Sequence, residues 1–155
     1  MIDLLKKDEL VRATFTKNSK IDNVKKLFEF YQIENLFEKI EWIEMNLTDT
    51  TQVYDAVKDI DHVYHSAAIV SFNKKDRDKI KNINITGTSN IVNACLNEKI
   101  KKLGFISSVA AIGRKTNGEN IYSEKNKWSA SKANSFYAIS KYKAENEVWR
   151  GVQEG

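Results

Sequence analysis

Two residues one helical turn apart could transfer protons. Tyr137 and Lys141 lie four positions apart in the segment Tyr-Ala-Ile-Ser-Lys, and side chains with this spacing share one face of a helix. An ammonium group beside a phenol favours the phenolate form, which prepares the phenol to exchange a proton with an alcohol or carbonyl oxygen near pH 7. The pair therefore predicts acid–base chemistry on an oxygen-bearing substrate.

The spacing alone is not specific, because Tyr54 and Lys58 repeat it. The repeat lies on a short predicted helix with no serine-rich strand end before it. Tyr137, in contrast, follows a predicted strand that ends in Ser107 and Ser108. Ligands of parallel α/β sheets bind at the carboxyl ends of the strands, so these hydroxyls could converge with a Tyr/Lys pair on the next helix. We therefore assign the chemistry to the pair that begins at Tyr137.

Strands and helices must position these side chains, and the sequence alternates between the two. Strand-like segments occur at 10–16, 40–45, 60–65 and 103–107, and segments with helical periodicity at 21–36, 49–57, 76–98 and 135–150. This alternation predicts parallel strands joined by helical crossovers. The expected fold is α/β, a Rossmann-like doubly wound parallel sheet, in a single domain of residues 1–155.

Composition argues against several other classes of protein. The net charge is +4, but the lysine pairs are interleaved with acidic residues, so solvated helix faces explain them better than nucleic-acid binding does. No apolar run approaches the roughly 20 residues of a membrane span. The lone Cys95 indicates a reducing, cytoplasmic environment. His62 and His65 would point to opposite faces of a strand, so no metal site is expected.

Five stretches in one order resemble the extended short-chain dehydrogenases/reductases, which form the NAD-dependent epimerase/dehydratase family. The stretches are Asn-Leu at 46–47, His-Ser-Ala-Ala at 65–68, Asn-Ile-Thr-Gly-Thr-Ser-Asn at 84–90, a strand ending in Ser-Ser within 101–113, and Tyr-Ala-Ile-Ser-Lys at 137–141. Several motifs in the family's order are far more specific than any one of them. Nucleotide-sugar epimerases and dihydroflavonol-reductase-like proteins are the branches that the chain is similar to.

The resemblance implies a role for each matched residue. Ser108 would hold the substrate oxygen that Tyr137 protonates or deprotonates, and Lys141 would also bind the nicotinamide ribose. Asn84 would anchor the backbone of the active site or hold a water molecule near Lys141. The residues implied to contact the cofactor are Lys17, Asn46, Leu47, His65, Ala67, Ala68, Ser107 and Lys141.

The cofactor implied by the resemblance is NAD or NADP. The segment 14–18 carries none of the acidic residues that favour NAD at the end of the second strand of this fold. Lys17 could instead meet a 2′-phosphate, which favours NADP slightly. The substrate would be a nucleotide sugar or a similar hydroxyl or carbonyl compound, and epimerase, dehydratase and reductase chemistry all stay open. The family also implies a homodimer formed through the long helix and the catalytic helix.

The sequence departs from the family in one important respect. The family begins with a strand and a glycine-rich loop, Gly-x-x-Gly-x-x-Gly, which holds the cofactor's pyrophosphate, and no such motif occurs in this chain. We therefore expect an internal fragment that lacks the first strand and the C-terminal substrate region, with little activity by itself. The alternative to a working enzyme is a non-catalytic dinucleotide-binding protein or an inactive relic of the fold.

Overall fold

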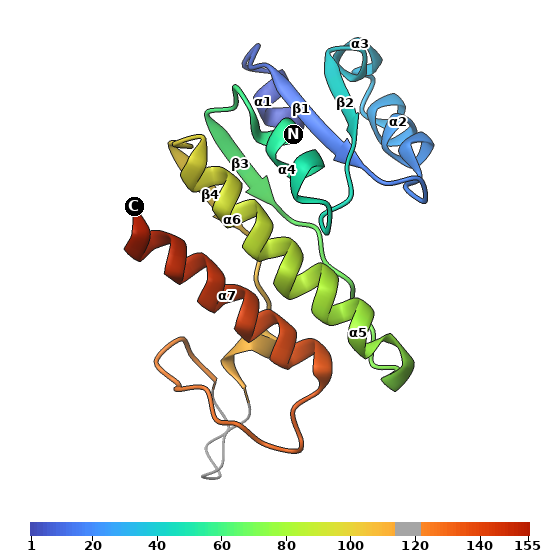
Figure 1. The fold of residues 1–155 in the computed structure, drawn as a ribbon. Helices are drawn as coiled ribbons and strands as arrows, with labels where there is room; N and C mark the ends of the chain where they lie inside the picture. The colour runs from blue at the N-terminus through green and yellow to red at the C-terminus, as the bar shows by residue number, and fades with distance from the viewer. Residues whose placement is uncertain (114–121) are drawn as a thin grey trace. The chain divides into compact units, whose positions relative to one another are not determined.

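The computed structural model describes residues 1–113 and 122–155 (Figure 1). The chain divides into two compact units, residues 1–46 and residues 47–155. Each unit contains a pair of parallel strands together with helices that precede or follow them. The parallel α/β class predicted from the sequence is confirmed.

The first unit is built on two parallel strands, β1 (Val11–Phe15) and β2 (Ile40–Glu44). Three helices belong to it: α1 (Ile2–Leu5), α2 (Ile21–Phe30) and α3 (Glu34–Phe37). Its core consists of buried apolar side chains from all of these elements, namely Leu5, Ala13, Phe28, Leu36 and Ile40.

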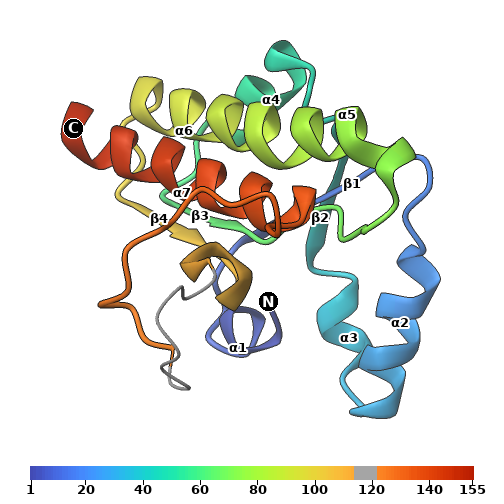
Figure 2. The same cartoon turned by 90° about the horizontal axis from the view of Figure 1, so that it is seen from below.

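The second unit contains the remaining elements. They are α4 (Thr50–Val57), β3 (His62–His65), the 3-10 helix η1 (Lys74–Asp76), α5 (Arg77–Ile80), the π-helix η2 (Lys81–Thr86), α6 (Gly87–Asn97), β4 (Lys102–Phe105), the 3-10 helix η3 (Val109–Ile112) and α7 (Phe136–Glu154). Strands β3 and β4 are parallel neighbours. Helix α7 runs beside α6, and Figure 2 shows the pair from a second direction.

Among the described residues, the strands form two separate pairs, β1–β2 and β3–β4. An unpaired strand edge leaves backbone N–H and C=O groups without a ladder partner.

Two predicted helices differ from the observed ones. The segment 21–36 was expected to be one helix, but α2 ends at Phe30 and α3 begins at Glu34. The backbone of Gln32 has a φ of 54°, a left-handed conformation that ends an α-helix. The segment 76–98 is helical as far as Asn97, but its middle is the π-helix η2 rather than an α-helix.

Two helix starts agree with the sequence interpretation. The helical segment 49–57 was expected to begin at Asp49, and the Oδ1 of Asp49 caps this helix by accepting a hydrogen bond from the backbone N–H of Gln52 at 3.2 Å. Ser135 caps α7 in the same way. In the part of the chain that the structure describes, no helix has the length and apolar character needed to cross a membrane.

Candidate active site

The pair of residues expected to transfer protons lies in the first turns of α7. The Oγ of Ser135 accepts a hydrogen bond from the backbone N–H of Ala138 at 3.1 Å. A serine at this position pairs with an amide that the helix itself leaves unpaired, so it fixes where the helix begins. Tyr137 therefore lies in the first turn, and Lys141 follows one turn later on the same face.

Lys141 is buried, with 3% of its surface exposed. Its Nζ donates a hydrogen bond to the backbone oxygen of Ile106 at 2.7 Å and lies 4.3 Å from the ring centroid of Phe105. Burial lowers the pKa of Lys141, and the carboxylate of Glu145 acts in the opposite direction. The ammonium group is thus held where β4 ends, which is where a parallel sheet binds its ligand.

The two serines after β4 both connect to neighbouring structure. The Oγ of Ser108 accepts a hydrogen bond from the backbone N–H of Ala110 at 3.2 Å and caps η3. Helix η3 packs against α7. The hydroxyl of Ser107 donates a hydrogen bond to Oε1 of Glu145 on α7. The end of β4 and the helix of Tyr137 are therefore joined by side-chain contacts as well as by packing.

Asn84 lies inside the π-helix η2 and is 1% exposed. Its Oδ1 accepts a hydrogen bond from the N–H of Ile69 at 2.7 Å, and its Nδ2 donates to the oxygen of Ile69 and to the Oγ of Ser140, both at 3.0 Å. Ser140 in turn donates to the backbone oxygen of Tyr137 at 2.7 Å. The amide of Asn84 thus anchors the backbone after β3 and is linked to Tyr137 through one hydroxyl. π-Helical turns are frequent at functional sites.

His65 is buried, and the hydrogen bonds of the Thr88 hydroxyl show which ring nitrogen of His65 carries the proton. The hydroxyl of Thr88 has a single hydrogen, which it donates to the backbone oxygen of Asn84 at 2.7 Å. The contact of 2.9 Å between Thr88 Oγ1 and His65 Nε2 must therefore be donated by the histidine. Burial, and secondarily the charge of Lys141, lowers the pKa of His65 to about 4. His65 is consequently neutral near pH 7, with its proton on Nε2.

The low pKa of His65 predicts a loss of stability in acid. The native state binds the His65 proton less readily than the unfolded chain, whose histidine titrates near 6.5. Stability should therefore be complete above about pH 6.5 and fall as the pH decreases toward 4, by roughly 3 kcal/mol from this residue. Urea unfolding at a series of pH values measures the loss, and His65→Gln should remove that part of it.

His62, an exposed residue of the same strand, provides the control for this measurement. His62→Gln should retain the loss of stability between pH 6.5 and 4 that is assigned to His65. If His65→Gln instead lost stability between pH 6.5 and 4 as steeply as the unmodified protein does, the assignment to His65 would be wrong.

The residues expected to contact a cofactor differ in how far they are exposed to solvent. Ala67 and Ala68 follow β3 directly and are exposed. Leu47 is buried, its backbone oxygen accepts a hydrogen bond from Asn90 Nδ2 at 2.8 Å, and its side chain lies over Gly87. A Cβ atom at Gly87 would come within 2.9 Å of Leu47 Cβ, so this position requires glycine.

The hydrogen bonds of the second unit connect three of the expected residues to one another. His65 is linked to Asn84 through Thr88, and Asn84 is linked to Tyr137 through Ser140. The remaining expected residues, Lys17 and Asn46, are exposed and belong to the first unit.

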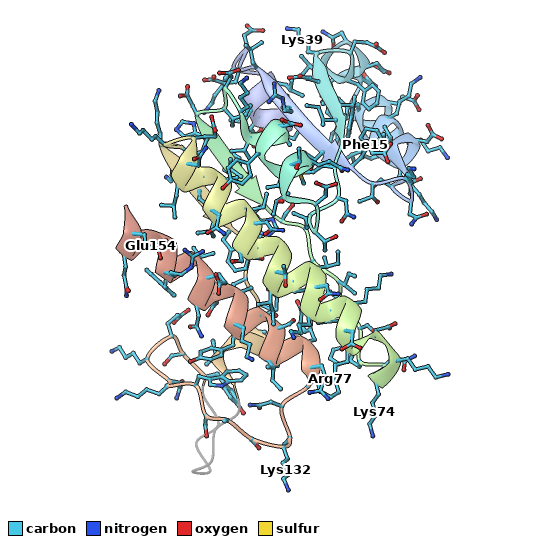
Figure 3. The ribbon with its side chains drawn as sticks, viewed as in Figure 1. Phe15, Lys39, Lys74, Arg77, Lys132 and Glu154 are labelled. Atoms are coloured by element: carbon cyan, nitrogen blue, oxygen red, sulfur yellow. The ribbon has the colours of Figure 1, made fainter. Side chains whose placement is uncertain are left out.

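Several participants were missed by the sequence interpretation. Glu145, one turn after Lys141, could have been noticed from its helical spacing alone. Phe72 lies edge-on to Tyr137, with ring centroids 6.1 Å apart, but no local pattern marks it. The guanidinium of Arg77 lies 4.5 Å from the ring centroid of Phe136, at the start of α7 (Figure 3).

The chain is similar in sequence to a known protein family and to several of its members. The chain matches the 3-beta hydroxysteroid dehydrogenase/isomerase family over residues 6–153. It is 30% identical over 152 residues to a dihydroflavonol 4-reductase-like protein of Synechocystis sp., across 98% of this chain and 40% of the relative. It is also 30% identical over 112 residues to the 3 beta-hydroxysteroid dehydrogenase/Delta 5-->4-isomerase of Vaccinia virus, across 72% of this chain and 32% of the relative.

A solved structure shows the same fold. The UDP-glucuronic acid 4-epimerase of Bacillus cereus, determined in complex with NAD, superimposes with a TM-score of 0.74 at 22% sequence identity. The alignment covers 98% of this chain and 47% of the epimerase. The Rossmann-like fold class predicted from the sequence is thus confirmed. The chain spans about 40% of the length of the first of these relatives and less than half of the other two.

Proposed function

Because this chain belongs to the 3-beta hydroxysteroid dehydrogenase/isomerase family, we propose that it carries the proton-transfer site of an NAD(P)-dependent reductase, dehydratase or epimerase. The observation that carries the proposal is the buried ammonium of Lys141, held at the end of β4 one helical turn from Tyr137. Burying a charged group costs free energy of folding. A buried ammonium group beside a phenol is therefore more readily explained by a role in proton transfer than by a contribution to stability.

In this proposal each residue has one task. During reduction, Tyr137 donates its phenolic proton to the carbonyl oxygen of the substrate, and during oxidation it accepts the proton of the alcohol. Ser108 hydrogen-bonds the same substrate oxygen. The ammonium of Lys141 stabilises the phenolate that remains on Tyr137. Asn84 keeps the segment at Ile69 and the start of α7 in place through its hydrogen bonds.

The residues after β3 fit a dinucleotide. Ala67 and Ala68 are small and exposed at the carboxyl end of the strand, so a ribose or phosphate could approach the backbone closely there. His65, the last residue of β3, is buried and neutral near pH 7. When bound, a nicotinamide dinucleotide would supply or accept the hydride.

We propose a reductase or dehydrogenase acting on a ketone or secondary alcohol as the first reaction to test, and a nucleotide-sugar epimerase as the second. The curated relatives named above support the first, and Phe72, which is 74% exposed beside Tyr137, supports an apolar substrate. The B. cereus epimerase supports the second reaction only through its fold.

A substrate panel tests the proposal in the protein as its gene encodes it. Dihydroquercetin, a 3β-hydroxysteroid and UDP-glucose would each be incubated with NADPH or NADP⁺ and with NADH or NAD⁺. A change in absorbance of the reduced nicotinamide with either of the first two substrates supports a reductase or dehydrogenase. Conversion of UDP-glucose to UDP-galactose supports an epimerase. No turnover with any of the three, in a protein shown to bind the cofactor, would favour the non-catalytic alternative.

We further propose that the cofactor is NADP. The carboxyl end of β1, which Phe15 marks in Figure 3, opens into a groove of about 420 Å³. Lys17, Lys20 and Lys26 line it, together with a single acidic residue, Asp22. An excess of cationic side chains suits the 2′-phosphate of NADP, whereas NAD is usually held there by an acidic residue.

Lys17→Glu should therefore reverse or abolish the preference for NADP. The ratio of kcat/KM with NADPH to kcat/KM with NADH is expected to fall about 10- to 100-fold, because a charge-assisted contact to the phosphate is lost and a repulsive charge is gained. Steady-state kinetics with both cofactors measure the ratio.

Lys25→Glu makes the same change of charge on helix α2, at a residue that does not line the groove. It should leave the ratio close to that of the unmodified protein. An equal fall for both variants would indicate a general effect of net charge and would count against a specific phosphate site.

A further inference from the structure

Glu145 stands at the meeting point of two residues that the proposed function uses. It lies one turn after Lys141 on α7, and its Oε1 accepts the hydrogen bond of the Ser107 hydroxyl. Ser107 immediately precedes Ser108 at the end of β4. One carboxylate therefore contacts the serine segment and lies beside the ammonium group, which no motif of the sequence indicated.

The surroundings of Lys141 explain why a carboxylate matters there. Lys141 has only 3% of its surface exposed, and the loss of hydration on burial favours the neutral amine unless other groups compensate. Its direct contacts are a backbone oxygen at 2.7 Å, from Ile106, and the face of the Phe105 ring at 4.3 Å. Both favour a cation, but neither carries a full negative charge.

The charged and titratable groups near Lys141 come from two elements, β3 with His65 and α7 with Tyr137 and Glu145, which lie one turn before and one turn after Lys141. His65 on β3 is neutral near pH 7, since burial lowers its pKa to about 4. Glu145 on α7 is the group that opposes the effect of burial on the pKa of Lys141. Side chains four apart on a helix are neighbours, so the carboxylate of Glu145 lies near enough to the ammonium group of Lys141 to favour its charged form.

We infer that Glu145 is a positioning residue of this site: its carboxylate orients the hydroxyl of Ser107 and keeps the buried side chain of Lys141 in its charged form. The inference rests on the proposed function, because the site has a catalytic role only under that proposal. The contacts from which it is argued all lie in the second unit of the chain. Glu145 acts through Ser107 and Lys141 and touches neither the substrate nor the cofactor.

The test is the titration of Lys141 itself. In protein labelled with 13C at lysine Cε, the NMR signal missing from Lys141→Arg identifies this residue, and its shift is followed with pH. Glu145→Gln keeps the size of the side chain and an acceptor for Ser107 but removes the charge. The midpoint of the Lys141 titration should move to lower pH in Glu145→Gln and return toward the original value in Glu145→Asp.

Glu147→Gln is the matched control, because it makes the same substitution two positions further along α7. Glu147 accepts hydrogen bonds from Ser89 at 2.8 Å and from Arg150 at 3.1 Å. This variant should leave the midpoint of Lys141 unchanged. An unchanged midpoint in Glu145→Gln, or an equal shift in Glu147→Gln, would overturn the inference.

A kinetic measurement separates this inference from the proposed function. If Lys141 must be charged for turnover, the alkaline limb of the kcat/KM profile should move to lower pH in Glu145→Gln together with the NMR midpoint. A loss of activity at every pH with no movement of the limb would contradict the inference. The proposed function fails on a different result, namely undiminished turnover by Tyr137→Phe, and that outcome would not change the Lys141 midpoints measured in the Glu145 variants.

Discussion

Replacing Tyr137 with phenylalanine is expected to lower kcat by about 10²- to 10⁴-fold while KM changes little. The substitution removes only the phenolic oxygen. The edge contact with Phe72, whose ring centroid lies 6.1 Å away, involves the ring and is retained. Because proton transfer occurs only in the transition state, its loss should appear in kcat rather than in substrate binding. Steady-state kinetics on the protein as its gene encodes it, with the substrate found in the panel, measure both constants.

The chain supplies its own control for this substitution. Tyr54 and Lys58 have the same spacing as the proposed pair, but Tyr54 lies on α4, a short helix away from the end of β4. Tyr54→Phe should leave kcat and KM within about twofold of their original values, since the Tyr54 phenol has no part in the proposed proton transfer. A comparable loss in both variants would point to a general structural effect, and no loss in Tyr137→Phe would refute its role as the acid and base.

The parts of the fold that depend on local sequence could be predicted closely. Asp49 and Ser135 cap helices that begin at Thr50 and Phe136, because a cap depends on a side chain and an amide only three positions away. The alternation of strands and helices was visible for the same reason. It also led to the correct fold class, since parallel strands need helical crossovers.

Backbone conformations that break a periodic pattern could not be predicted. Val24, Leu27, Phe28 and Tyr31 continue a helical stripe without interruption in the sequence, yet the helix ends at Phe30. The cause is the positive φ of the next residue but one, a glutamine with no special preference for that conformation. The π-helix around Asn84 could not be predicted from the sequence either, because one extra residue per turn barely changes the spacing of the apolar residues.

Contacts between elements that are distant in the sequence could not be predicted either. The sequence indicated Ser107, Asn84 and Lys141 as members of a site, but not what holds them. Ser107 meets Glu145, and Asn84 meets Ser140, only after β4, η2 and α7 have packed together. Tertiary packing thus pairs Ser107 with Glu145, which lies one turn beyond the Tyr-Ala-Ile-Ser-Lys motif, and pairs Asn84 with Ser140, a motif residue to which the sequence assigned no role.

Asn84 is where such a second contact matters most for stability, and Asn84→Ala is expected to lower the free energy of unfolding by about 3 to 5 kcal/mol. The substitution leaves the N–H and the oxygen of Ile69 without their partner, and it removes a donor from the Oγ of Ser140. Each buried polar group left unpaired costs about 1–3 kcal/mol. Urea unfolding followed by circular dichroism measures the difference.

Two further variants decide whether hydrogen bonding is the cause. Asn84→Asp keeps an acceptor for the N–H of Ile69 but loses both donated bonds, so it should also destabilise the protein. Asn97→Ala, at the exposed end of α6, should change stability by no more than about 0.5 kcal/mol. If Asn84→Asp proved as stable as the unmodified protein, the bonds to Ile69 O and Ser140 would contribute little. The link from the π-helix to the backbone of Tyr137 would then have to rest on packing alone.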